Sequence, residues 1–131
     1  MTIIESKKTI GKPVAGVYSF LADLNNHQQL MPENIYNWSS TATEARFTIQ
    51  NMAKLALKVG ELIPNQSIQI IPAEAPPFEM ELKWLVTPNG DQTEVTYRIS
   101  ADLNMMMKML ASGPLQKLAD HETSRLAEVL K

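Results

Sequence analysis

The chain has 131 residues, of which 44% are hydrophobic and 20% are charged, and its net charge at pH 7 is −2. This length is typical of a single domain, here residues 1–131, and the composition argues against an intrinsically disordered chain. The small net charge offers no basic face for nucleic acid, and the lack of cysteine excludes disulfides, zinc–thiolate sites and cysteine nucleophiles.

The N-terminal part of the chain predicts a strand followed by two helices. Residues 2–10 are rich in Ile and Thr and alternate loosely, which is typical of a strand. Pro13 favours the first position of a helix, where its missing N–H costs nothing. A short second helix is expected through Met31, because Pro32 disfavours helical backbone in the residue before it. The apolar stripe of the first helix consists of Val14, Val17, Tyr18 and Leu21.

The same N-terminal segment bears on location. Residues 1–8 carry charge where a signal peptide has an apolar stretch. No run in the chain approaches the roughly 20 apolar residues that span a bilayer. We therefore expect a cytoplasmic protein without stable membrane insertion.

From about residue 34 to residue 102 the hydrophobic pattern has a period of two. The clearest alternation runs from Phe78 to Val86, where apolar residues alternate with charged ones. Such alternation is typical of antiparallel strands with one buried and one solvated face. The residues predicted to face inward are Phe47, Leu57, Ile68, Ile70, Phe78, Met80, Leu82, Trp84, Val95, Tyr97 and Ile99.

Turn-forming residues separate these apolar runs. They are Asn51, Pro64-Asn65, Pro76-Pro77 and Pro88-Asn89-Gly90-Asp91. Short connections between successive strands indicate an antiparallel meander. We expect about six strands in this region.

A helical pattern returns after Asp102 and continues to Lys131. Gly113-Pro114 interrupts it, and we expect a kink or a short break there, because proline removes a backbone hydrogen bond and clashes with the preceding turn. The whole order is strand, two helices, about six strands and a long helix. It predicts an α+β helix-grip fold, in which a curved antiparallel sheet of about seven strands wraps around the C-terminal helix.

Two stretches carry a family resemblance. The first runs from Ile10-Gly11-Lys12-Pro13 through residues 17–23 to Leu30-Met31-Pro32, and the second is Gly113-Pro114-Leu115 before a helix. In this order they resemble the START-like superfamily, which includes polyketide cyclases and is also called SRPBCC. The resemblance implies a cavity between the sheet and the long helix. Members bind lipids, sterols, polyketides or other apolar molecules, and some catalyse cyclisation, dehydration or hydrolysis without a shared catalytic motif.

The implied cavity defines a set of candidate ligand-binding residues. Apolar pockets with a few polar groups are the usual small-molecule sites, and Tyr97 and Trp84 can supply such groups. The alternative is that the inward-facing residues simply fill a core. The candidates are Phe47, Leu57, Ile70, Met80, Leu82, Trp84, Val95, Tyr97, Ile99, Met107, Leu110, Leu118 and Glu122.

Residues 104–110 read Asn-Met-Met-Met-Lys-Met-Leu, with four methionines in five positions. Methionine is flexible and polarizable and suits surfaces that repack around variable partners. The segment therefore favours a cavity lip, a homodimer contact or another docking surface. The alternative is ordinary packing with tolerated exposure.

Glu122 is the sharpest single candidate. It falls in the middle of the apolar stripe of the last helix, where an unpaired carboxylate is costly and its pKa rises. One interpretation is a polar anchor, or a general acid/base, at the floor of the cavity. The alternatives are a salt bridge to Arg46 or Arg98, or a side chain that bends out to water. The stripe consists of Leu115, Leu118, Ala119, Leu126, Val129 and Leu130.

Other chemistry is poorly represented. His27 and His121 have no nearby ligand cluster and no serine in a triad-like pattern, so we expect no metal and no cofactor and assign no catalytic residue. The leading hypothesis is binding of an apolar or amphipathic small molecule. The alternatives are a cyclase, dehydratase or hydrolase that uses the same cavity with Glu122 as acid/base, and an interaction subunit that docks through the methionine-rich turn.

Overall fold

The computed structural model describes residues 1–50, 53–76 and 78–130, and over these residues seven antiparallel strands form one curved sheet. The strand order is β1-β7-β6-β5-β4-β3-β2, so the meander from β2 to β7 is completed by β1, which pairs with β7. The strands are β1 (Thr2–Ile10), β2 (Ile35–Ser40), β3 (Glu44–Ile49), β4 (Ala53–Ile63), β5 (Ser67–Pro72), β6 (Met80–Asn89) and β7 (Gln92–Ala101).

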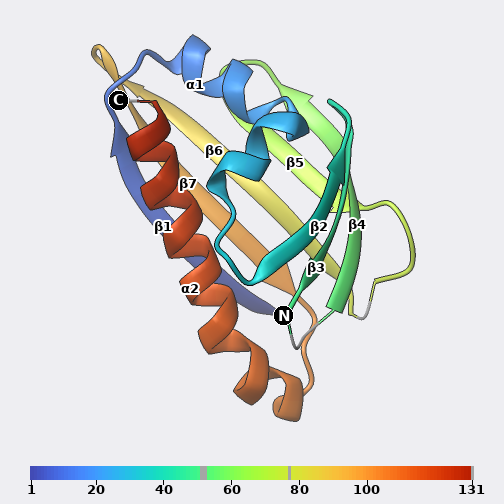
Figure 1. The fold of residues 1–131 in the computed structure, drawn as a ribbon. Coiled ribbons are helices and arrows are strands. Elements are labelled where there is room, and N and C mark those ends of the chain that lie inside the picture. Colours follow the sequence, from blue (N-terminus) through green and yellow to red (C-terminus); the bar gives the residue numbers. More distant parts are fainter. Residues whose placement is uncertain (51–52, 77, 131) are drawn as a thin grey trace.

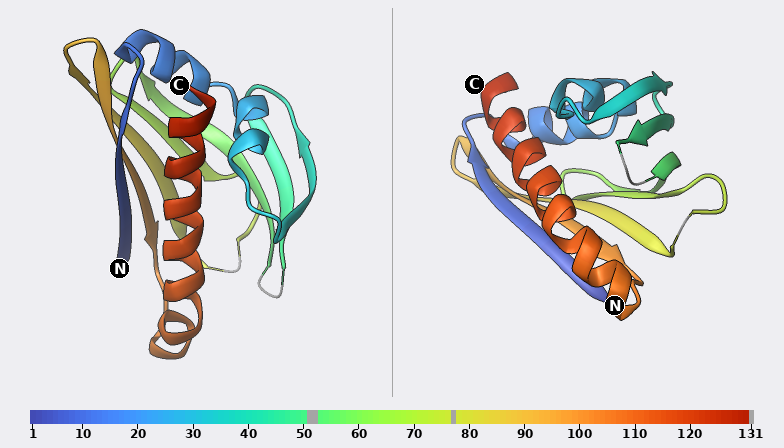
Figure 2. Two further views of the ribbon diagram at one scale, coloured as in Figure 1. Left: turned by 60° about the vertical axis from the view of Figure 1, so that its left-hand side comes forward. Right: turned by 60° about the horizontal axis from the view of Figure 1, so that its bottom comes forward.

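Three helices accompany the sheet: α1 (Val14–Leu21), the 3-10 helix η1 (Leu24–Leu30) and α2 (Met105–Val129). The sheet curls around α2, which runs along its concave face (Figure 1). Figure 2 shows α1 and η1 on the same side of the sheet, near the C-terminal end of α2. The predicted helix-grip α+β fold, with six strands between residues 34 and 102, is confirmed.

The alternation of apolar and polar residues in the sequence corresponds to the two faces of the sheet. Along β6, Met80, Leu82, Trp84 and Val86 are buried, and the residues between them are more exposed. Charged side chains occupy the outer face, where Arg98 pairs with Glu5 at 2.8 Å. The concave face is therefore the one that contributes to the core.

Two predicted turns owe their shape to residues that tolerate a left-handed backbone. Asn65, between β4 and β5, has φ 58°, and Gly90, between β6 and β7, has φ 65°. The other two predicted turns are only partly visible, because Asn51 and Pro77 lie outside the described residues.

The helix starts follow local capping. Pro13 is the residue before α1 and has an extended ψ of 154°, so it precedes the helix by one position rather than occupying its first turn. The side chain of Asp23 accepts a hydrogen bond of 3.0 Å from the backbone N–H of Asn25 and thereby caps η1.

Asn104 caps the start of α2, and its side chain accepts a 2.8 Å hydrogen bond from the N–H of Met107. The predicted short break at Gly113-Pro114 is wrong, because α2 continues through Pro114 to Val129. Gly113 and Pro114 lie on the exposed side of the helix, where water can bond the carbonyl that proline leaves free. The buried side consists of Ala111, Leu115, Ala119, Glu122, Thr123 and Leu126.

α2 is also the longest helix among the described residues, and neither it nor any other described helix has the length and apolarity to cross a bilayer.

Candidate functional site

An apolar cavity lies between the concave face of the sheet, η1 and α2. Its volume is about 40 Å³, whereas a dry protein cavity that holds benzene measures roughly 150 Å³. A ligand therefore has to displace lining side chains as it enters. The lining consists of Leu24, His27, Met31, Trp38, Ala45, Phe47, Ile49, Leu55, Leu57, Ile70, Phe78, Met80, Leu82, Tyr97, Ile99, Leu115, Leu118 and Glu122.

Three lining side chains are placed to make room. Met31 and Met80 are unbranched and flexible, so they can change rotamer at low cost. Phe78 is half-buried and lines both the cavity and a shallow surface groove that also contains Met107. Phe78 therefore lies between the cavity and the surface groove.

Glu122 supplies an acidic group to the cavity wall from α2. The residue is 2% exposed, and the Tyr97 hydroxyl lies close to its carboxyl in the cavity wall. Burial raises the pKa of Glu122 to about 8, although the Tyr97 hydroxyl beside it opposes this effect. Burial, and secondarily the neighbouring Glu122, raise the pKa of Tyr97 well above 10. Both groups are consequently uncharged in most molecules at neutral pH.

The sheet register and one hydrogen bond explain why Glu122 faces inward. Ser6 lies opposite Tyr97, and Tyr97 lies opposite Trp84, so β1, β7 and β6 present a row of side chains on the concave face. The hydroxyls of Ser6 and Thr123 are 2.8 Å apart and share a buried hydrogen bond. Thr123 and Glu122 are adjacent on α2, and their contacts with this row fix the rotation of the helix about its axis.

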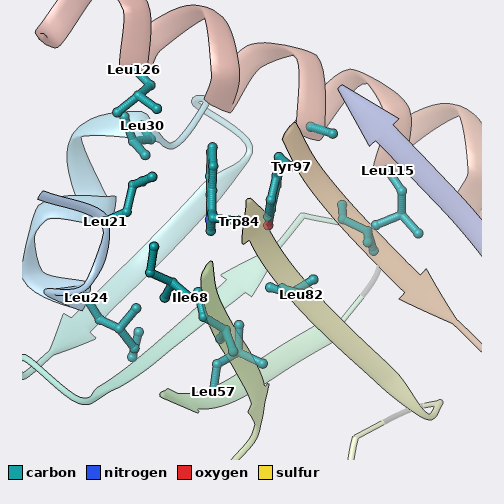
Figure 3. Packing of buried hydrophobic residues seen from close by; sticks show 14 of the residues in the cluster. Leu21, Leu24, Leu30, Leu57, Ile68, Leu82, Trp84, Tyr97, Leu115 and Leu126 are labelled. Carbon is teal, nitrogen blue, oxygen red and sulfur yellow. The ribbon is translucent and has the colours of Figure 1, made fainter. Parts of the chain in front are cut away.

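Trp84 lies directly against Tyr97. The two rings are stacked, with centroids 4.0 Å apart and an interplanar angle of 13° (Figure 3). Trp84 is 0% exposed, and its indole N–H finds no hydrogen-bond partner among the described residues. An unpaired buried donor costs about 1–3 kcal/mol. The two rings are therefore well packed, but the indole N–H of Trp84 lacks a hydrogen-bond acceptor among the described residues.

His27 brings a second titratable group to the wall, from η1. Its Nε2 donates a 2.8 Å hydrogen bond to the backbone carbonyl of Leu21, which leaves Nδ1 as an acceptor in the neutral ring. Burial lowers the pKa of His27 from its ordinary value of 6.5, so the ring is neutral at pH 7. The ring packs edge-on against that of Trp84, with ring centroids 6.1 Å apart. Glu122, Tyr97 and His27 are thus three uncharged polar groups on a wall that is otherwise apolar.

The fold is similar to those of several solved structures. No family model and no curated protein matches the chain. A START superfamily protein from Mycobacterium smegmatis aligns with a TM-score of 0.69 at 17% identity, over 98% of this chain and 96% of that one. The chain has a START-like fold. KanY, whose solution structure aligns with a TM-score of 0.81, is 13% identical over 98% of this chain and 97% of its own. The Aha1 dimer from Colwellia psychrerythraea aligns with a TM-score of 0.69 at 20% identity, over 99% of this chain and 96% of that one.

Nine of the thirteen candidates from sequence line the cavity of this START-like fold: Phe47, Leu57, Ile70, Met80, Leu82, Tyr97, Ile99, Leu118 and Glu122. Four do not belong to the lining. Trp84 lies behind Tyr97, and Val95 is buried elsewhere in the core. Met107 lines the surface groove, and Leu110 is 70% exposed. Whether any of the thirteen binds a ligand stays a prediction.

The lining also contains residues that the sequence-based set lacked. Ala45, Ile49 and Leu55 share the buried face of β3 and β4 with Phe47 and Leu57, so the period-two pattern could have found them. Phe78 was among the residues predicted to face inward but was not a candidate for ligand binding. The others come from outside that pattern: Leu24 and His27 in η1, Met31 after it, Trp38 in β2, and Leu115 in α2.

The partners of Arg46 and Arg98 test whether Glu122 forms a salt bridge. Arg46 bonds Glu74, and Arg98 bonds Glu5, and both pairs lie at the surface. The predicted salt bridge between Glu122 and either arginine is therefore wrong, as is a side chain that bends out to water, because the residue is buried.

The methionine-rich turn lies at the free end of α2. Met105, Met106 and Met109 are 72–83% exposed, and Figure 1 shows the first turns of α2 projecting past the end of the sheet. Met107 is the member of the group that reaches the groove beside Phe78. The turn therefore presents an apolar surface to solvent, and through Met107 it adjoins the groove that Phe78 also lines.

Proposed function

We propose that this protein binds an apolar or amphipathic small molecule, such as a lipid or a polyketide, in the cavity between the sheet and α2. One observation carries the proposal: the apolar cavity contains the buried, uncharged pair of Glu122 and Tyr97. This combination of an apolar wall with a few convergent polar groups is the usual make-up of a small-molecule site.

The alternative, that these residues only fill a core, accounts less well for Glu122. A carboxyl with no basic partner loses its hydration on burial, and this lowers stability compared with a leucine at the same position. The flexible Met31 and Met80 in the lining also suit a cavity that expands around a ligand. The similarity to a START superfamily protein also supports a fold that binds hydrophobic ligands.

The test is native mass spectrometry of the protein purified from its own source, followed by extraction of whatever dissociates. Ala45, buried on β3, lines the cavity, so Ala45→Ile fills the space with a residue that favours strands. Ala56 pairs with Arg46 on the outer face, so Ala56→Ile is the matched control. We expect an apolar molecule at near-unit stoichiometry in the wild type and control, and at least about tenfold less in Ala45→Ile. A clean apo mass in all three contradicts the proposal.

A second candidate function is favoured by the protonation of Glu122. General acid/base catalysis is most efficient when the pKa lies near the operating pH, and the pKa of Glu122 is about 8. In this version the cavity is that of a cyclase, dehydratase or hydrolase, with Glu122 as acid/base and Tyr97 as its orienting partner. Turnover of the co-purified molecule by the wild type but not by Glu122→Gln is the expected result. Equal turnover by both proteins, or none by either, contradicts it.

The exposed methionines favour a homodimer as a further property. Met105, Met106 and Met109 form an apolar surface that single soluble chains usually keep small. The similar Aha1 from Colwellia psychrerythraea is a dimer in solution. The proposed contact is the first turn of α2, and its test is the mass of the particle in solution.

A further inference from the structure

The charges around the cavity restrict which ligand it can accept. Within the described part of the chain, no lysine or arginine lines the wall. Arg46 and Arg98 are held outside by Glu74 and Glu5. Arg125, on the same helix as Glu122, bonds the carbonyl of Gln29 and the carboxylate of Glu128 at the surface. A negatively charged head group inside the cavity therefore meets no compensating cation.

The polar groups that do face the cavity are suited to uncharged oxygen. A protonated carboxyl offers one O–H donor and one carbonyl acceptor, and the Tyr97 hydroxyl can also donate or accept. Behind Tyr97, the indole N–H of Trp84 is a donor without a partner. Glu122 and Tyr97 line the same cavity, and Trp84 stacks on Tyr97 from the neighbouring strand β6.

We infer that the ligand carries an uncharged oxygen group, a carbonyl or a hydroxyl, at the end that reaches Glu122 and Tyr97, and that the cavity discriminates against carboxylate, phosphate and ammonium heads on a body of equal size. The inference rests on the proposed function and specifies its ligand.

Desolvation is the physical reason for the discrimination. A carboxylate or phosphate loses its water and gains no cation in return, which is far more costly than burying a hydrogen-bonded carbonyl. An ammonium can pair with an ionised Glu122, but both charges then lose their hydration, and a buried ion pair often fails to recover this cost. A carbonyl oxygen keeps one hydrogen bond and leaves every group uncharged.

Four single-ring probes of nearly equal size test this: ethylbenzene, acetophenone, benzoate and benzylammonium. Their dissociation constants are measured by chemical-shift titration of the labelled protein at about pH 6, where the Glu122 carboxyl is protonated. We expect acetophenone to bind about tenfold more tightly than ethylbenzene, which corresponds to one hydrogen bond. We expect both ions to bind more weakly than ethylbenzene.

Two substitutions assign the preference to Glu122. Glu122→Leu should retain ethylbenzene binding and lose most of the advantage of acetophenone. Glu122→Gln keeps a hydrogen-bond donor, so it should retain part of that advantage. The wild-type affinity for acetophenone should also fall as the pH rises through about 8, and that of Glu122→Gln should not. The other titratable groups of the wall do not account for such a loss, because burial lowers the pKa of His27 in η1 and raises that of Tyr97 in β7, both away from pH 8.

The outcomes separate the two proposals. Equal affinity for ethylbenzene and acetophenone, or tightest binding of either ion, overturns the inference about the head group and leaves the binding function standing. An acetophenone preference that survives in Glu122→Leu also overturns it. If none of the probes binds and the purified protein carries no apolar molecule, the proposed function itself fails.

Discussion

The hydroxyl of Tyr97 lies close to the carboxyl of Glu122 in the cavity wall, and this contact joins β7 to α2 inside the core. It places a weak acid where the surrounding side chains are apolar. The acid is uncharged in most molecules at neutral pH because burial opposes its ionisation. The contact therefore links the stability of the fold, its response to pH and the chemistry of the cavity.

The first prediction concerns stability against pH. The pKa of Glu122 is raised from 4.5 to about 8 in the folded state. The folded protein therefore holds a proton that the unfolded chain releases, and this stabilisation is complete below about pH 4.5 and lost as the pH rises to about 8. The loss is on the order of 5 kcal/mol. Denaturant unfolding of the wild type and Glu122→Gln checks it across this range.

The comparison with Glu122→Gln removes the effect of other groups. The lowered pKa of His27 has the opposite sign, because it makes the protein less stable as the pH falls below its ordinary value of 6.5, but both proteins share it. We expect the free energy of unfolding of the wild type, relative to that of Glu122→Gln, to decrease steadily between pH 4.5 and 8. Parallel curves for the two proteins contradict the buried, protonated carboxyl.

The second prediction concerns Tyr97→Phe. The Tyr97 hydroxyl lowers the pKa of Glu122, so its removal should raise that pKa above about 8. The loss of this buried polar contact should also lower the free energy of unfolding by about 1 kcal/mol. The pKa is read from the carboxyl carbon shift of Glu122 during an NMR titration. Tyr36→Phe, at an exposed tyrosine, is the control and should leave it unchanged.

The burial of Glu122 could be predicted because helical periodicity places it among Leu115, Ala119 and Leu126. The identity of its neighbour, Tyr97, could not be predicted from the sequence. Tyr97 and Glu122 meet only because α2 crosses β7 at one particular height, which depends on the length of the connection and on the packing of the whole helix. A pattern of period 3.6 defines the buried side of a helix, but not the strand that this side meets.

The same limit explains why Met107 and Leu110 lie outside the cavity lining. They continue the apolar pattern toward the start of α2, but these turns extend past the end of the sheet, where Leu110 is exposed and Met107 lines only the surface groove. The lining residues Leu24 and Trp38 were missed for the converse reason. They lie in η1 and β2, where short segments become part of the cavity only through the curl of the sheet.

The third prediction uses Trp38 as a reporter. Trp38 lines the cavity and stacks on Phe47, with ring centroids 5.2 Å apart, whereas Trp84 is fully buried outside the lining. A ligand should therefore change the emission of Trp38 more than that of Trp84. Titration with 1-hexanol, which does not absorb near the tryptophan band, should alter the fluorescence of the wild type. In Trp38→Phe, where the stack on Phe47 is kept, most of the change should vanish. An undiminished change in that variant places the ligand elsewhere.

The fourth prediction concerns the exposed end of α2. If Met105, Met106 and Met109 form a dimer contact, the triple change to glutamine should reduce the particle mass from twice to once the chain mass of 14.7 kDa. Light scattering after size exclusion measures this. The stability of the folded chain should change by less than about 0.5 kcal/mol per site, because exposed positions away from the core tolerate substitution. Lys108→Gln, in the same turn, is the control and should remain dimeric. A wild type that is monomeric, or a triple variant that stays dimeric, removes the methionine turn from the interface and leaves it as the exposed rim beside Phe78.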